Sequence, residues 1–232
     1  MKKNLQAYIG GLTLLTALAM PVRLAAQGNT AQANKPAQHH HYQLIDLGTF
    51  GGPTSYFSNG FDGILNPQGT NAGWADTSTP DPYYPNCLNP DCFVSHAFQW
   101  QKGTTIDLGV LPGGQSSSAA WISNTGLIAG LSQNGLIDPL LPGIPEVRAV
   151  LWRNRQIIDL GTLGGNESSA SSVNNRGQVV GLATNNIPDR FSFLVTQLRA
   201  FLWQDGAIQD LGTLGTGNDA AASFVNEAGQ VS

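Results

Sequence analysis

Short apolar runs alternate with polar gaps along most of the chain, and the pattern is clearest near its middle. Residues 149–152 form an apolar run that ends in Trp152, and residues 157–160 form a second run after a short polar gap. Residues 168–173, small side chains that close on a valine, and residues 178–180 continue the pattern. Runs of this length, bounded by Gly, Asn and Asp, are typical of strands. We therefore predict four short strands arranged as two hairpins.

The polar gaps contain the residues that tight turns require. Asp205 and Gly206 match a type I′ turn, in which both central residues need positive φ, and Lys102 and Gly103 take the same place earlier in the chain. In the second hairpin an Asn or Ser, whose side chain can bond the backbone two residues on, precedes a Gly that accepts positive φ. These pairs are Asn66 with Gly69, Ser123 with Gly126, Asn174 with Gly177 and Asn226 with Gly229. Such turns need no ligand.

The whole pattern repeats with a period near 50 residues. Trp100, Trp152 and Trp203 are 52 and 51 residues apart, and each precedes an Asp-Leu-Gly by seven residues. The aspartates of these motifs are Asp107, Asp159 and Asp210, and a fourth motif begins at Asp46. Self-similarity at this period is typical of propellers, solenoids and arrays.

We predict an all-β fold of repeated four-stranded antiparallel units, β-propeller-like and incomplete, with about four units. A β-solenoid is the alternative, and it would pair strands in parallel with neighbouring coils. Residues 42–48 match the second strand of the pattern without its first, and the chain stops as the last strand begins, so we expect a fragment truncated at the C-terminus. The expected units are 42–95, 96–147, 148–198 and 199–232.

The N-terminus resembles an export signal. Lys2 and Lys3 precede an uncharged apolar segment, residues 5–20, which is shorter than the roughly 20 residues that a spanning helix needs. We expect a signal peptide, residues 1–26, with a competing cleavage site after Ala19. A flexible polar leader, residues 27–41, follows. The mature protein is then secreted, with no stable membrane span.

Charge argues against a nucleic-acid partner. Only 11% of residues are charged, and the chain has 28 Gly and 13 Pro, a composition typical of turn-rich β proteins. Removing residues 1–26 takes away three basic side chains and no acidic one, which changes the formal charge from −4 to −7. Nucleic-acid binding requires basic stripes instead.

Three segments between the repeated strands vary in sequence, and loops on a repeated scaffold commonly carry binding. These segments are residues 75–95, 132–147 and 183–198. The first holds both cysteines, Cys87 and Cys92. In an exported protein this short separation predicts a disulfide. A metal or redox pair is the alternative, although Cys-x4-Cys without further ligands is a weak zinc signal.

No catalytic, cofactor or metal site is predicted. An aspartate present in every unit is expected to accept backbone hydrogen bonds from the glycine turn that follows it, and the serines at 116–118 and 168–172 have no positioned histidine base. Asp76, Asp81 and Asp91 share one loop, but their spacing matches no calcium-binding EF-hand. His39 to His41 are expected to lie in a solvated linker. Because Arg148 and Arg199 replace His96 in the later units, we expect a repeated structural hydrogen bond there. The three tryptophans are expected in the core rather than in a sugar platform.

Three motifs together resemble the bacterial extracellular HAF repeat family, named after its His-Ala-Phe. They are His-Ala-Phe-x-Trp at His96, Asp-Leu-Gly-x-Leu at Asp107 and Asp159, and Asn-x-x-Gly-Gln-Val-Val-Gly at Asn174. The resemblance covers residues 42–232, and it departs from the pattern at Arg148, Arg199 and Pro112. It implies export and a repeated, propeller-like β fold, and it implies no enzyme activity.

The expected function is therefore an exported, non-catalytic binding or surface scaffold protein. Its unknown extracellular ligand is a glycan or a protein, and its specificity lies in the variable segments. A purely structural envelope or matrix protein is one alternative. A carbohydrate-active enzyme is another, and it would require carboxylates from different units to converge in a cleft.

Overall fold

The computed structural model describes residues 42–57 and 63–232. The predicted signal peptide (1–26) and leader (27–41), which includes the three consecutive histidines, lie outside the described residues. Residues 45–232 form one compact unit.

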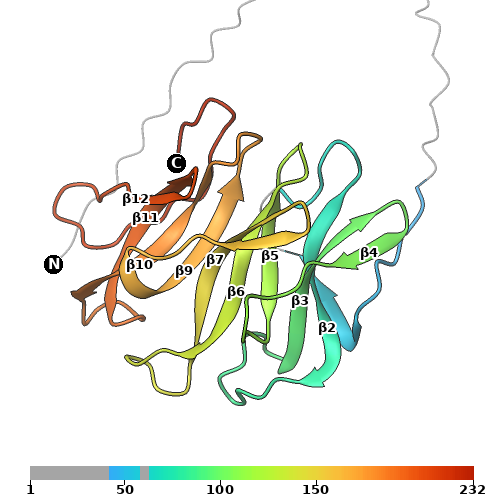
Figure 1. Ribbon diagram of the computed structural model, residues 1–232, viewed down its shortest axis with the longest axis horizontal. Coiled ribbons are helices and arrows are strands. Elements are labelled where there is room, and N and C mark those ends of the chain that lie inside the picture. The colour runs from blue at the N-terminus through green and yellow to red at the C-terminus, as the bar shows by residue number, and fades with distance from the viewer. Residues whose placement is uncertain (1–41, 58–62) are drawn as a thin grey trace, which may run out of the picture. The chain divides into compact units, whose positions relative to one another are not determined.

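In the described ranges the chain forms twelve strands and no helix, and the strands make three four-stranded sheets (Figure 1). The first sheet consists of β1 (Gly51–Tyr56), β2 (Asn71–Pro80), β3 (Phe93–Gln101) and β4 (Thr104–Asp107). The second consists of β5 (Ser117–Ile122), β6 (Ile128–Ile137), β7 (Pro145–Arg153) and β8 (Gln156–Asp159). The third consists of β9 (Gly164–Val173), β10 (Val179–Pro188), β11 (Thr196–Gln204) and β12 (Ala207–Asp210).

Each sheet follows chain order, and every neighbouring pair of strands is antiparallel. This confirms the predicted repeated four-stranded antiparallel units. The β-solenoid alternative is wrong, because it needs parallel ladders between successive coils and the named strands form none. The arrangement is compatible with a propeller.

The turns explain where the hairpins form. Lys102 and Gly103 have φ values of 49° and 84°, and Asp205 and Gly206 have values of 52° and 88°, as a type I′ turn requires. In the other hairpin turn the Asn174 side-chain oxygen accepts bonds from the backbone N–H groups of Arg176 (3.0 Å) and Gln178 (3.1 Å). Asn66 and Asn226 bond in the same way, and Ser123 uses its hydroxyl.

A glycine on the third-sheet strand β10 lies against the backbone of β9. A Cβ atom on Gly181 would lie 2.0 Å from the carbonyl oxygen of Ser169, and the β9–β10 register shifts at this point. Gly130 meets the same obstruction at Ser118 in the second sheet. The repeated glycine is therefore needed for close approach of two strands at a bulge.

The sheets are not in phase with the sequence units. Each sheet begins after an Asp-Leu-Gly. Its first hairpin, which has Asn or Ser in the turn, comes from one sequence unit, and its second hairpin, which contains the repeated Trp, comes from the next. Residues 42–48, expected as a strand, lie outside every sheet. The physical reason is that the equivalent strands β4, β8 and β12 pair with a preceding Trp strand, which residues 42–48 lack.

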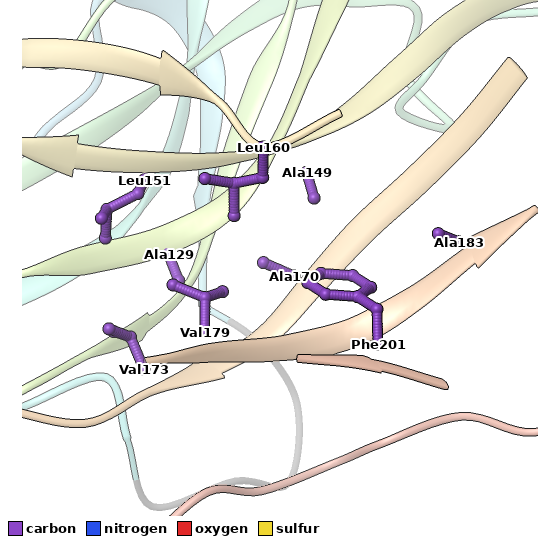
Figure 2. Packing of buried hydrophobic residues seen from close by; sticks show 9 residues of the cluster. All are labelled: Ala129, Ala149, Leu151, Leu160, Ala170, Val173, Val179, Ala183 and Phe201. Carbon is purple, nitrogen blue, oxygen red and sulfur yellow. The ribbon is translucent and has the colours of Figure 1, made fainter. Parts of the chain in front are cut away.

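Apolar side chains fill the spaces between successive sheets. The cluster between the second and third sheets is drawn in Figure 2, where the ring of Phe201 lies beside Ala170. Ala149 belongs to β7 of the second sheet, and Leu160 directly follows β8. A second cluster joins the first and second sheets and includes Trp152, which is 2% exposed. These buried contacts hold the sheets face to face, since apolar burial is the main favourable term in folding.

Candidate functional site

The repeated aspartates have a structural role. The Oδ1 atoms of Asp46, Asp107, Asp159 and Asp210 each accept a hydrogen bond from the N–H of the glycine two residues later, at 2.9, 2.7, 2.8 and 2.7 Å. Each bond closes the glycine turn that follows the aspartate, as the sequence predicted, and the turns at Asp107 and Asp159 lead from one sheet to the next. These four side chains do not come together in one site.

The predicted hydrogen bond at the His96 position is present in two of three units. The His96 ring bonds to Asp107 at 2.7 Å, which raises the pKa of His96, and Arg199 pairs with Asp210 at 3.0 Å. Arg148 is the exception, because its guanidinium bonds to Glu146 at 3.1 Å instead. In the second sheet the arginine therefore forms an ion pair within β7 and does not bond to Asp159.

Two serines join the sheets, a role that sequence reasoning missed. The Ser168 hydroxyl donates to the carbonyl of Gly161 (2.7 Å) and accepts from the N–H of Ala149 (2.8 Å). Ser117 makes the equivalent bonds to Gly109 and Ala97. The signal was their separation of 51 residues, which matches the repeat period of 51 to 52 residues set by the tryptophans.

The tryptophans occupy equivalent places, each in the third strand of its sheet and opposite the start of the second. Trp100 pairs with Asn71, Trp152 with Ile128, and Trp203 with Val179. Trp152 is buried, whereas the other two are partly buried. Burial is therefore unequal at a position that the repeat makes equivalent.

The ends of the variable segments belong to strands, and their middle parts form three loops, residues 81–92, 138–144 and 189–195. Each loop opens on a buried aspartate eight residues after the glycine of its second strand, a periodic signal that the sequence analysis missed. The carboxylate of each aspartate accepts the N–H two residues later: Asp81 from Tyr83, Asp138 from Leu140 and Asp189 from Phe191.

The first loop contains the predicted disulfide. Cys87 and Cys92 are bonded to each other, with their Cα atoms 5.2 Å apart. The same loop contacts the second, because the Asn86 side-chain amide donates to the carbonyl of Gly143 at 3.0 Å. The first loop is thus fixed both internally and against the second.

All three loops meet at one pocket of about 200 Å³. Its walls include Cys87 and Leu88 from the first loop, Ile144 from the second and Leu194 from the third. Glu167 of β9 and Gln133 of β6 also line it, and both are buried, at 4% and 0% exposure. This pocket is our candidate site, because it is built by the segments that differ from unit to unit.

The carboxyl group of Glu167 has one fixed and one unpartnered oxygen. Its Oε2 accepts the N–H of Val147 at 2.8 Å, a bond that Ser116 and Asp219 make to Ser95 and Leu198 in the neighbouring units. Its Oε1 is buried and has no hydrogen-bond partner among the described residues. Comparison of the units could have singled out Glu167. At the equivalent positions the shorter side chains of Ser116 and Asp219 already accept the backbone N–H, so the longer glutamate is not needed for that bond.

The surroundings of Glu167 make it hard to ionise. Burial raises its pKa to about 7, the nearby carboxylates of Asp138 and Glu146 add to the rise, and the bond from Val147 and the charge of Arg148 oppose it. The neutral, protonated form is therefore more populated than in an ordinary glutamate, and Oε1 accepts a hydrogen bond when the group is ionised.

Apart from Glu167, two acidic side chains lie close together in the first sheet and its loop. The Thr54 hydroxyl contacts a carboxyl oxygen of both Asp76 and Asp91, the latter at 2.8 Å, and Tyr56 donates to Asp91 at 2.8 Å. A hydroxyl donates only one hydrogen, so one contact needs a protonated carboxyl, and burial, which raises the pKa of Asp76, favours that residue. Asp81 bonds elsewhere, and the described residues contain no group of three or more metal-ligand side chains.

Two larger hollows are less suited to specific binding. One of about 480 Å³ lies at the strand ends away from the loops, where Asp107 is already bonded to His96 and Gly109. Another of about 440 Å³ adjoins Asn166, whose amide is bonded to Asp138. Neither is lined by all three loops.

No helix in the described part of the chain is long and apolar enough to cross a membrane. Comparisons with protein-family models, with curated proteins and with solved structures found no match to this chain.

Proposed function

We propose that the chain is an exported, non-catalytic binding protein built from HAF-type β repeats, and that it holds an extracellular ligand at the pocket formed by its three loops. The observation that carries this proposal is the convergence of loops 81–92, 138–144 and 189–195 on one pocket with a buried polar floor. Rigid strands fix the ends of each loop, so the loops can vary while the pocket keeps its place.

The surface of the loops supports a binding role. They expose large apolar side chains, which a purely structural role does not require. Exposed apolar patches commonly mark interaction sites. These side chains are Tyr84, Leu140, Ile144, Phe191, Phe193 and Val195. The disulfide supports export, since disulfides persist in oxidising compartments.

The pocket favours binding over glycoside hydrolysis. Hydrolysis uses two carboxyl groups on opposite sides of the scissile bond, about 5 to 10 Å apart. Among the described residues Glu167 is the one carboxyl group that lines the pocket. Asp76 and Asp91 lie together but are bonded to Thr54 and Tyr56.

The test is a glycan and surface-protein array, probed with the full chain and with variants in which each loop is replaced by a Gly-Ser linker of equal length. We expect the replacements to reduce or abolish binding. The matched control replaces the turn at Asn154 and Arg155, at the opposite strand ends, with Asn-Gly, and it should bind like the parent. Binding that survives all three loop replacements would refute the proposal, and no binding by any form would favour a structural role.

A further inference from the structure

Two residues that line the pocket, Glu167 and Gln133, each have one unpartnered polar atom. Glu167 Oε2 is held by the N–H of Val147, which leaves Oε1, and Gln133 Oε1 is held by the N–H of Ser116 at 3.0 Å, which leaves Nε2. Both remaining atoms are buried, and neither has a hydrogen-bond partner within residues 42–57 and 63–232. A buried polar group without a partner costs free energy, so both atoms favour a ligand that completes their bonding.

The orientation of the Gln133 amide is set by its surroundings. Because the N–H of Ser116 needs an acceptor, the oxygen of the amide faces Ser116 and the NH₂ group is the unpartnered one. When Glu167 is ionised, a ligand group that satisfies both atoms must donate one hydrogen bond and accept another. A hydroxyl does so, whereas an ammonium only donates and a carboxylate only accepts.

The charge and the size of the pocket further restrict the class of ligand. Asp138 and Glu146 lie near Glu167 against the single positive charge of Arg148, and β6 and β10 carry no charged side chain, so an anion is disfavoured. In the third loop Asp189 is bonded to Phe191, and Arg190 lies over the Phe191 ring. A volume of about 200 Å³ has room for one small ring.

We infer that the pocket binds a single neutral sugar residue, whose hydroxyl groups donate to Glu167 and accept from Gln133. This inference rests on the proposed binding function and names its ligand class. The aliphatic walls formed by Leu88, Ile144 and Leu194 contact the carbon face of the ring. Exposed aromatic side chains on the first and third loops, Tyr84, Phe191 and Phe193, offer flat apolar surfaces to any adjoining sugar.

The test exchanges the donor and the acceptor. In Glu167→Gln the new amide oxygen still accepts from Val147, so its NH₂ replaces the free acceptor and two donors face the ligand. In Gln133→Glu two acceptors face it. The double variant Glu167→Gln with Gln133→Glu restores one donor and one acceptor with unchanged net charge.

We expect methyl glycosides of glucose, galactose and mannose, measured by saturation-transfer NMR and titration calorimetry on the full chain, to include at least one binder. Each single variant should weaken that binding by about tenfold or more, because a buried group is left unpaired. The double variant should recover most of the loss. Glu227→Gln, a change of the same type at an exposed glutamate, should have no effect, and circular dichroism on every variant separates lost binding from lost folding.

Three results would overturn the inference. Single variants that fold and bind normally would show that the two atoms do not contact the sugar. Tighter binding of n-butylamine than of any glycoside, strengthened by Gln133→Glu, would assign the pocket to a cation. Failure of all glycosides, while the loop replacements still alter binding on the array, would reject the sugar and leave the proposed binding function standing.

Discussion

At the scale of single residues, the repeat shows which side chains carry more than a structural role. The position of Glu167 needs only one acceptor for a backbone N–H, and Ser116 and Asp219 supply it in the neighbouring units. Glu167 adds a buried oxygen with no structural bond among the described residues. Such a group destabilises the fold when it ionises, and the ligand that we propose would give it a partner.

The pKa of Glu167 predicts how stability depends on pH. Because its folded pKa of about 7 exceeds the ordinary value of 4.5, its contribution is fully present below pH 4.5 and is lost as pH rises through 7. This loss amounts to about 3 kcal/mol at most. We expect Glu167→Gln to flatten the fall in unfolding free energy between pH 5 and pH 8.5, measured by urea denaturation. His96 acts in the same direction, so the difference between the two proteins isolates Glu167, and equal pH slopes would contradict its assigned pKa.

At the scale of elements, the sheets are joined by polar bonds as well as by apolar packing. Ser168 connects the turn at Gly161 to β7 across the boundary between the second and third sheets. Ser117 does the same between the first and second sheets. These hydroxyls tie the entry of each new sheet to the previous one.

Removing one such hydroxyl should weaken the junction. Ser168→Ala leaves the N–H of Ala149 and the carbonyl of Gly161 without this bond in the interior, so we expect the unfolding free energy to fall by about 1 to 3 kcal/mol. The matched control is Ser169→Ala on the same strand, with an expected change of less than about 0.5 kcal/mol. Chemical denaturation measures both, and similar losses in the two variants would exclude the bridging role.

The disulfide acts on one element, the first loop. It closes a short ring between Cys87 and Cys92, for which chain entropy gives a stabilisation of about 2 kcal/mol. We expect the double variant Cys87→Ala with Cys92→Ala to keep the three sheets, seen by circular dichroism, but to unfold at a lower temperature. Mass spectrometry of the non-reduced secreted protein, treated with a thiol reagent, should detect no labelled cysteine, and two labelled thiols would show that the pair is not bonded.

At the scale of the whole molecule, the sequence predicts what repeats and misses what does not. The hairpins, the turns and the Asp-Leu-Gly bonds follow from local chemistry that recurs in each unit. The joining of hairpins into sheets depends on pairing between β6 and β7, which periodicity does not record. The pocket depends on three loops that share little beyond their first aspartate, so no local pattern predicts that Leu88 and Leu194 line the same cavity.

Because each sheet combines hairpins from two consecutive sequence units, the boundary of the repeat can be drawn at any residue. The hairpin of Trp152 and the hairpin of Asn174 are neighbours in the chain but belong to different sheets. A tandem duplication that starts at any residue and ends at its equivalent about 51 residues later therefore adds one complete sheet, because every added strand finds its usual partner. Recombination can thus lengthen or shorten such an array by one sheet at a time from any breakpoint, and each such change adds or removes one of the loops that begin with a buried aspartate.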